Sequence, residues 1–318
     1  MRRLFAAVLP VSLLMAACSD RSTFAGKEIS AVASVYPLAW VAEQVAPDAD
    51  VTLLSAGGLE AHDLELSPDQ RGKIEASDVV MFVGEIGYQP QVEQALTSAE
   101  GVVVSLSEVA GPERLLEPGD GPHAQGDEGE EHTEDVEGEE QHDEAVVDPH
   151  IWFAPDVMAD AAVQAGEAFA AADPTNAATY EGNAETVRAE FADLGRELDE
   201  ILGGTCTHGE AIVSHQAYSY LLEPYGVEQH GVTGINPEAG AASGELAELV
   251  AEIEAKGFGH VLTEPVEGRE GAETVAREAR VELLEISPLD AVTEEQAAVG
   301  FVDLVRQQAE QFATALGC

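Results

Sequence analysis

Three histidines lie in local contexts that suit metal binding. His62 follows an apolar stretch and precedes a proline that can begin a helix, His150 directly follows an acidic segment, and His215 follows the apolar run 211–213. Imidazole binds zinc with metal–nitrogen distances of about 2.0–2.1 Å, and three imidazoles leave one tetrahedral position open. These side chains are therefore candidate ligands for zinc or another borderline divalent metal.

The spacing of these histidines does not define a site by itself. The sequence contains no H-E-x-x-H pair, and a single histidine after a strand is more often a structural residue than a ligand. Position in the fold is more informative, because ligands of open α/β sheets gather beyond the carboxyl ends of strands. His62 and His215 satisfy this rule in two predicted lobes, so we expect a cleft between the lobes to bring them together.

Short β-rich runs alternate with amphipathic stretches from residue 26 onward, a pattern typical of α/β units with parallel sheets. The length of 318 residues allows two lobes of ordinary domain size. For the first lobe we predict strands at 29–35, 51–54, 79–83 and 102–106, and helices at 37–45, 68–76 and 91–99. For the second we predict strands at 211–214, 227–230, 260–263 and 281–286, and helices at 217–222, 243–256, 271–279 and 293–316.

Apolar residues spaced three or four apart over 174–202 predict one long helix between the lobes. The predicted fold is thus α/β, with two lobes that are each a mainly parallel sheet flanked by helices, joined by one long connecting helix. The predicted boundaries are 27–172 for the N-terminal lobe, 173–203 for the connecting helix and 204–318 for the C-terminal lobe. A single rigid helix would limit hinge motion. The alternative is a plain surface helix of one lobe.

An acidic segment at 117–145 differs from the rest of the chain in composition. It is rich in Gly, Asp and Glu, is almost free of apolar residues, and contains His123, His132 and His142. Such a segment cannot bury enough apolar surface to order itself. We expect a disordered loop that weakly collects metal ions, and the alternative is an acidic insertion whose histidines have no role.

The first 18 residues have the features of an export signal. Arg2 and Arg3 precede an apolar run that ends in small residues and is too short to span a bilayer. The sequence LMAAC over residues 14–18 resembles a bacterial lipobox, in which cleavage before the cysteine allows its lipidation. We predict an exported protein anchored through Cys18 to the extracytoplasmic face of the cell membrane. An ordinary cleaved signal peptide is the alternative.

The net charge narrows the possible binding partners, and the cysteines bear on the cellular compartment. A formal net charge of -47 argues against nucleic acid and against anionic lipid surfaces as partners, so we expect membrane contact through the lipid anchor alone. The same acidity also suits a solvated surface in high salt. The other two cysteines are Cys206 and Cys318, and in an oxidising compartment we expect them to form a disulfide.

Three motifs in combination resemble those of the zinc and manganese solute-binding proteins of ABC transporters. They are GLEAHDLELSP at 58–68, DPHIW at 148–152, and SHQAYSYL at 214–221 followed by Tyr225 and Gly226. The resemblance runs from about residue 29 to residue 318 and implies two lobes with the metal between them. It also implies that the ligands are His62, His150 and His215, and the third histidine points to zinc rather than manganese.

The resemblance leaves the fourth ligand open. The acidic position of the D-P-L motif in that family is occupied here by Ser287, within ISPLD at 286–290. Water, Asp290 or Glu60 could complete the coordination. Asp148 and Asp63 are candidates for orienting the imidazoles or for capping helices and turns. Glu264 is expected to be structural or to support a ligand.

The leading functional prediction is binding without catalysis. The protein would capture Zn²⁺ between its lobes and deliver it, as a monomer, to an ABC transporter permease and ATPase complex. The alternatives are a secreted zinc hydrolase, since three histidines and an open position also describe catalytic zinc, and a metal-dependent surface adhesin or metal chaperone.

Overall fold

The computed structural model describes residues 29–55, 61–62, 64–117, 147–234, 243–265 and 269–318. Several predictions concern residues outside these ranges. They are the signal segment with Cys18, nearly all of the acidic segment with its three histidines, and the side chains of Glu60 and Asp63.

The first lobe is built on a four-stranded parallel sheet with the order β2-β1-β3-β4. Its strands are β1 (Ser30–Ala33), β2 (Asp50–Leu53), β3 (Val79–Phe82) and β4 (Val102–Ser105). Along β3, Val79 and Met81 enter one buried cluster while Val80 and Phe82 enter another. Because helices cover both faces, the strand is apolar at every position. The helices are α1 (Tyr36–Val45), α2 (Pro68–Ala76), α3 (Pro90–Leu96), α4 (Leu106–Ala110) and α5 (Pro155–Ala172).

The second lobe repeats this arrangement. Its sheet is parallel with the order β6-β5-β7-β8, formed by β5 (Glu210–His215), β6 (Glu228–Thr233), β7 (His260–Thr263) and β8 (Glu282–Glu285). The helices are α7 (Ser219–Leu222), α8 (Ser243–Lys256), α9 (Arg269–Ala279), α10 (Glu294–Ala297) and α11 (Phe301–Leu316). The predicted α/β class, with two mainly parallel sheets flanked by helices, is confirmed.

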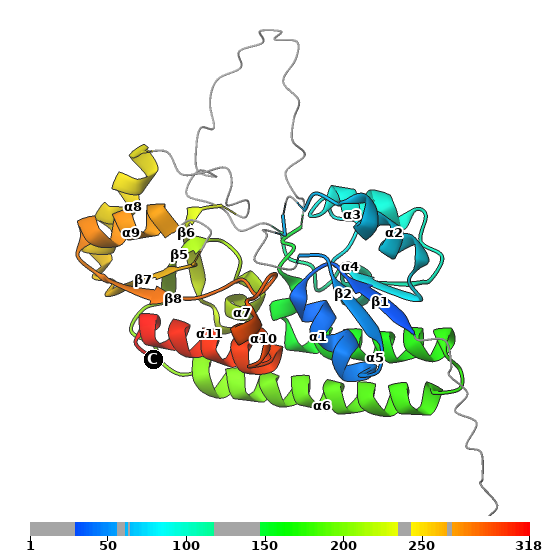
Figure 1. The fold of residues 1–318 in the computed structure, drawn as a ribbon. Helices are drawn as coiled ribbons and strands as arrows, with labels where there is room; N and C mark the ends of the chain where they lie inside the picture. The colour runs from blue at the N-terminus through cyan, green and yellow to red at the C-terminus, as the bar shows by residue number, and fades with distance from the viewer. Residues whose placement is uncertain (1–28, 56–60, 63, 118–146, 235–242, 266–268) are drawn as a thin grey trace, which may run out of the picture.

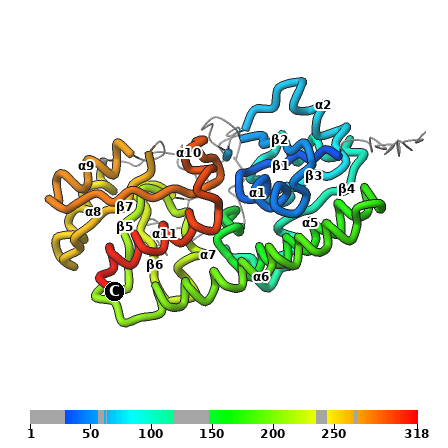
Figure 2. Tube along the Cα trace, turned by 60° about the horizontal axis from the view of Figure 1, so that its bottom comes forward, coloured from blue at the N-terminus to red at the C-terminus, as the bar shows by residue number. Residues whose placement is uncertain are grey.

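One long helix, α6 (Ala177–Leu202), runs beneath both lobes, as the two views in Figure 1 and Figure 2 show. It packs against α1 and α5 on the side of the first lobe and against α11 on the side of the second. Its buried positions recur every three or four residues, at Tyr180, Ala184, Val187, Phe191, Leu194, Leu198 and Leu202. The preceding helix α5 was not among the predicted elements.

Aromatic side chains join the lobes along this helix. Trp40 of α1 packs edge-on against Phe191 of α6 with ring centroids 5.7 Å apart, and Phe301 of α11 lies 6.1 Å from Trp40 and 6.2 Å from Phe191. These rings belong to one buried apolar cluster that includes residues of both sheets, such as Met81 and Leu262. A shared core of this kind opposes large rotation of one lobe against the other.

The prediction of a single final helix over 293–316 is wrong. The chain forms the short helix α10, then turns, and begins α11 at Phe301. The turn contains Gly300 with φ 94°, a conformation that favours glycine. A capping box in which Thr293 and Gln296 bond reciprocally begins α10.

The end of the chain is attached to the second lobe by a disulfide. Cys206, shortly after α6, is bonded to Cys318, 112 residues later. The predicted pairing is therefore present. In the described part of the chain, no helix combines the length and apolarity needed to cross a membrane.

Candidate metal centre

His215 and Glu264 lie side by side at the topological switch point of the second sheet. This point lies between β5 and β7, because β6 lies on one side of β5, and β7 and β8 lie on the other. Strand β5 pairs with β7 only at Val213 and Leu262, so His215 and Glu264 each follow this pair by two residues. Ligands of open α/β sheets bind at such a switch point, beyond the carboxyl ends of the strands. The Nδ1 atom of His215 is 2.8 Å from Oε2 of Glu264, and both side chains are buried.

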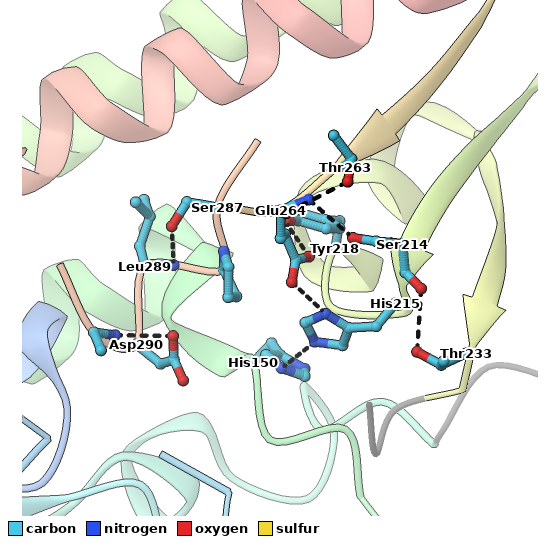
Figure 3. A network of polar contacts seen from close by, with 12 residues as sticks. His150, Ser214, His215, Tyr218, Thr233, Thr263, Glu264, Ser287, Leu289 and Asp290 are labelled. Carbon is cyan, nitrogen blue, oxygen red and sulfur yellow. Dashed lines mark hydrogen bonds and ion pairs between the residues drawn. The ribbon is translucent and has the colours of Figure 1, made fainter. Parts of the chain in front are cut away.

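The Glu264 carboxylate is itself held in place. The Tyr218 hydroxyl donates to its second oxygen, Oε1, at 2.8 Å, and the main-chain N–H of Glu264 donates to Oγ of Ser214 at 3.2 Å. Figure 3 shows this chain of contacts leading to His215. Both carboxylate oxygens therefore have a partner, which fixes the orientation of the imidazole. Glu264, which is expected to be structural or to support a ligand, thus contacts the imidazole of His215 directly.

His150 is held by a carboxylate in a different way. It directly precedes the short 3-10 helix Ile151–Phe153, and Asp148 lies two residues before it. Oδ1 of Asp148 accepts from the main-chain N–H of His150 at 2.9 Å and lies 2.7 Å from Nδ1 of the same ring. Asp148 therefore both shapes the turn and orients the imidazole, so the two predicted roles occur together.

His62 lies after β2 and packs against an aromatic ring. Its imidazole meets Tyr88 edge-on, with ring centroids 4.7 Å apart. The adjacent backbone is held by Gln89, whose side-chain nitrogen donates to the carbonyl oxygen of Ala61 at 3.0 Å. Although the residue as a whole is partly exposed, Nε2 is buried and has no hydrogen-bond partner in the described structure.

The electrostatic environment keeps His62 neutral. Burial lowers the pKa of His62 well below its usual value, and the nearby His150 and His215 lower it further. A neutral imidazole with a buried, unpartnered nitrogen is ready to bind a metal ion without first losing a proton.

The three predicted histidines come together between the lobes. Each offers one ring nitrogen, and these atoms all lie within 4.8 Å of one another. The ring centroids are separated by 5.4 Å for His62 and His150, 6.0 Å for His62 and His215, and 5.3 Å for His150 and His215. The Nε2 atoms of His150 and His215 are 3.4 Å apart. Two nitrogens on a tetrahedral zinc ion would be about 3.3 Å apart.

The hydrogen bonds of the outer nitrogens determine what the inner nitrogens can do. Carboxylates accept hydrogen bonds, so the Nδ1 atoms of His150 and His215 carry protons directed at Asp148 and Glu264. In the neutral rings, the Nε2 lone pairs then face each other. A cation between them removes this repulsion, and the arrangement therefore suits a metal ion or a shared proton.

A buried carboxylate, Asp290, lies beside this group on the side of His150. It is 3% exposed, its Oδ1 accepts from the main-chain N–H of Ala291 at 2.8 Å, and Figure 3 shows it on the His150 side of the site. Burial raises the pKa of Asp290, and the hydrogen bond from the main-chain N–H of Ala291 lowers it in part.

Ser287 occupies the position where the resembled family has its acidic residue. Its hydrogen bonds are made within its own turn and to Gln308. Its hydroxyl accepts from the main-chain N–H of Leu289 at 3.3 Å, and its own N–H donates to Oε1 of Gln308 at 2.9 Å. Ser287 therefore shapes the turn that leads to Asp290.

The other described histidines lie outside this centre. His230 forms a second group of potential ligands with Glu210 and Glu228, at the opposite end of the second sheet. The ammonium of Lys256 already contacts Glu210 in this group. His208 packs against Phe258, and His260 lies near Glu282.

Sequence reasoning missed one aromatic residue beside the site and one hydrogen bond of Trp152, a residue expected to pack around the site or in the core. Tyr88 was not considered, although it follows β3 and so lies beyond the carboxyl end of a strand, as His62 and His215 do. The indole of Trp152 donates to the carbonyl oxygen of Pro288 at 2.8 Å. A main-chain acceptor of this kind has no signature in the sequence.

Comparison with known proteins places these features in a family. Residues 31–315 match the family model described as the periplasmic component A of the zinc-uptake complex, ZnuA. The zinc-binding lipoprotein AdcA of Streptococcus pneumoniae strain R6 is 27% identical over 91% of this chain, which spans only 55% of that protein. The high-affinity zinc uptake system protein ZnuA of Bacillus subtilis is 26% identical over 93% of this chain and 91% of its own length.

The fold is also similar to that of solved structures. The Zn(II)-bound ZnuA-like domain of Streptococcus pneumoniae AdcA superposes with a TM-score of 0.70, covering 92% of this chain and 100% of that domain at 21% identity.

Proposed function

We propose that this chain, which belongs to the family of the periplasmic zinc-uptake component A, captures Zn²⁺ between its lobes for delivery to an ABC importer. His62, His150 and His215 supply three nitrogens, and Asp290 supplies a carboxylate oxygen as the fourth ligand. Of the candidates for the fourth position, Asp290 is favoured because it is buried and lies on the His150 side of the site (Figure 3). The hydroxyl of Ser287 is used within its own turn.

One observation supports this proposal more strongly than any other. The Nε2 atoms of His150 and His215 are 3.4 Å apart, and buried carboxylates on the far side of both rings direct their lone pairs toward the same point. A protein interior rarely keeps two acceptors facing each other without a cation. The spacing matches that of two nitrogens on tetrahedral zinc, at about 3.3 Å.

The donor set explains the expected preference for zinc. Imidazole is a ligand of borderline metals, whereas manganese prefers carboxylate, carbonyl and water oxygens. Three nitrogens and one oxygen therefore favour Zn²⁺ over Mn²⁺. Asp148 and Glu264 strengthen the selection, because a carboxylate that accepts the outer N–H raises the basicity of the imidazole.

Titration of the metal-free protein tests this proposal. Competition with a chromophoric chelator should give one tight zinc site and much weaker binding of manganese. His150→Ala and His215→Ala should each weaken zinc binding by at least about 100-fold. His208→Ala removes a histidine that packs on Phe258 away from the centre, and it should bind zinc as the parent protein does. Equal affinity in all four proteins would contradict the proposed site.

The cellular setting is proposed from the sequence and from relatives. A relative is named a lipoprotein, and the LMAAC sequence at 14–18 supports lipidation of Cys18 after export. The protein would then present its metal site at the extracytoplasmic face, beside a permease and its ATPase. The full-length chain, expressed with its own residues 1–18 in a bacterial host, should appear in the detergent phase on Triton X-114 partitioning, and Cys18→Ala should move it to the aqueous phase.

Binding rather than hydrolysis is the proposed use of the metal. The family is that of a transport component, and a fourth ligand from Asp290 would occupy the position that catalytic zinc leaves open for water. The zinc-loaded protein should therefore not turn over ester, peptide or phosphate substrates. Robust turnover that is lost in His150→Ala would instead support the zinc hydrolase. No observation favours the surface adhesin or the metal chaperone.

A further inference from the structure

The segment that ends at Asp290 belongs to the second lobe but is held by donors of the first. The indole Nε1 of Trp152 donates to the carbonyl oxygen of Pro288 at 2.8 Å. The main-chain N–H of Tyr36 donates to the carbonyl oxygen of Asp290 at 2.8 Å, and the hydroxyl of Ser55 donates to the same oxygen at 2.9 Å. Three donors thus hold two carbonyl groups of one short segment.

The backbone between these two carbonyls has an uncommon conformation. Leu289 is fully buried and has φ 63°, in the left-handed region that residues with a side chain seldom adopt. A conformation of this kind persists only where the surroundings hold it. The hydrogen bonds on both sides of Leu289, and the bond from its N–H to Ser287 (Figure 3), supply that restraint.

Trp152 connects this segment to a metal ligand. Its ring meets that of His150 edge-on, with centroids 5.3 Å apart, and the side chain is 1% exposed. The same indole therefore contacts the His150 imidazole in the first lobe and bonds the chain two residues before Asp290 in the second.

We propose that Trp152 is a positioning residue of the metal site, and that its indole N–H fixes the Asp290 carboxylate relative to His150. This inference rests on the proposed function. Without the indole N–H, the buried carbonyl of Pro288 loses its donor, and the segment relaxes toward a less strained backbone. Asp290 then leaves its place in the site, although every ligand side chain is still present.

The Trp152→Phe variant isolates the hydrogen bond, because phenylalanine keeps an aromatic ring in the buried position. We expect its zinc affinity, measured by chelator competition, to fall about tenfold, the lower range for loss of a group that supports a ligand. In an Asp290→Ala background the same substitution should change affinity less than about twofold, since no carboxylate remains to be positioned.

A spectroscopic measurement separates positioning from stability. Cobalt in place of zinc reports ligand geometry through its visible d–d bands. The Trp152→Phe spectrum should differ from that of the parent protein and resemble that of Asp290→Ala. Trp40→Phe is the matched control. It makes the same tryptophan-to-phenylalanine substitution at a residue that packs against Phe191 and Phe301. Because phenylalanine keeps an aromatic ring in the cluster where the lobes meet, Trp40→Phe should leave both the cobalt spectrum and zinc affinity unchanged.

The control variant also allows a test that does not depend on the folding of Trp152→Phe. The chain has two tryptophans, so in Trp40→Phe the only indole N–H signal in an NMR spectrum belongs to Trp152. We expect this proton to exchange slowly with solvent and to shift when zinc binds. Rapid exchange and an unchanged signal would overturn the inference.

The outcomes separate the inference from the proposed function. If the parent protein binds zinc and Trp152→Phe binds it equally well, the positioning role is wrong while the function stands. Equal weakening with and without Asp290 would also overturn it, by indicating a general effect on stability. Failure of the parent protein to bind zinc would contradict the proposed function itself.

Discussion

The Nε2 atoms of His150 and His215 face each other at 3.4 Å, and the Nδ1 atom of each ring meets a buried carboxylate. The two histidines come from different lobes. The position of one lobe relative to the other therefore sets the spacing of these two nitrogens.

The Glu264 carboxylate should be needed for tight binding. In Glu264→Gln the acceptor of the His215 N–H loses its charge, so the imidazole becomes a weaker base, and we expect zinc affinity to fall about tenfold. Chelator competition measures this change. Glu282→Gln, at an exposed carboxylate of β8, is the matched control and should have no effect. Equal affinity of both variants would mean that Glu264 has no role in binding.

Lowering the pH should destabilise the metal-free protein through His62. Its pKa is lowered well below 6.5 in the folded state by burial and by the neighbouring histidines, so below pH 6.5 the unfolded state binds a proton that the folded state does not. The free energy of unfolding should then fall as the pH drops below 6.5, by up to about 1.4 kcal/mol per pH unit.

Urea unfolding of the metal-free parent protein and of His62→Gln at several pH values measures this contribution. The raised pKa of Asp290 acts in the opposite direction, but it is common to both proteins, so their difference isolates His62. Identical pH dependence in the two proteins would show that His62 takes up a proton in the folded state as easily as in the unfolded state.

The parallel sheets and most of their helices could be predicted from the sequence, because strands covered on both faces are apolar throughout, as Val79–Phe82 is. The break before α11 was missed, since the apolar spacing continues across it and only the positive φ of Gly300 shows the turn. The three histidines were found by their motifs. The contact from Trp152 to Pro288 depends on a main-chain carbonyl and on the packing of two lobes, and no local pattern encodes it.

The disulfide should contribute to stability without affecting the site. It joins residues separated by 112 positions, and closing a loop of this size restricts the unfolded chain. In Cys206→Ser/Cys318→Ser we expect the free energy of unfolding to fall by about 2–4 kcal/mol, with zinc affinity unchanged. A large loss of affinity at temperatures where the variant is folded would show that the disulfide also shapes the metal centre.

The acidity of the chain should make its stability depend on salt. With a net charge of -47, repulsion between carboxylates opposes the compact state, and dissolved ions screen it. Raising sodium chloride from about 0.1 M to about 1 M should increase the melting temperature by several degrees. An uncharged solute at the same osmotic strength serves as the control. If that solute raised the melting temperature equally, the result would argue against electrostatic screening.

The central claim is that one zinc ion binds to the three imidazoles between the lobes. Diffraction from crystals of the zinc-loaded protein, measured on both sides of the zinc absorption edge, tests it most directly. We predict one strong anomalous peak within bonding distance of nitrogen atoms of His62, His150 and His215, with the Asp290 carboxylate as the fourth ligand. A peak at Glu210, Glu228 and His230, with none between the three imidazoles, would contradict it.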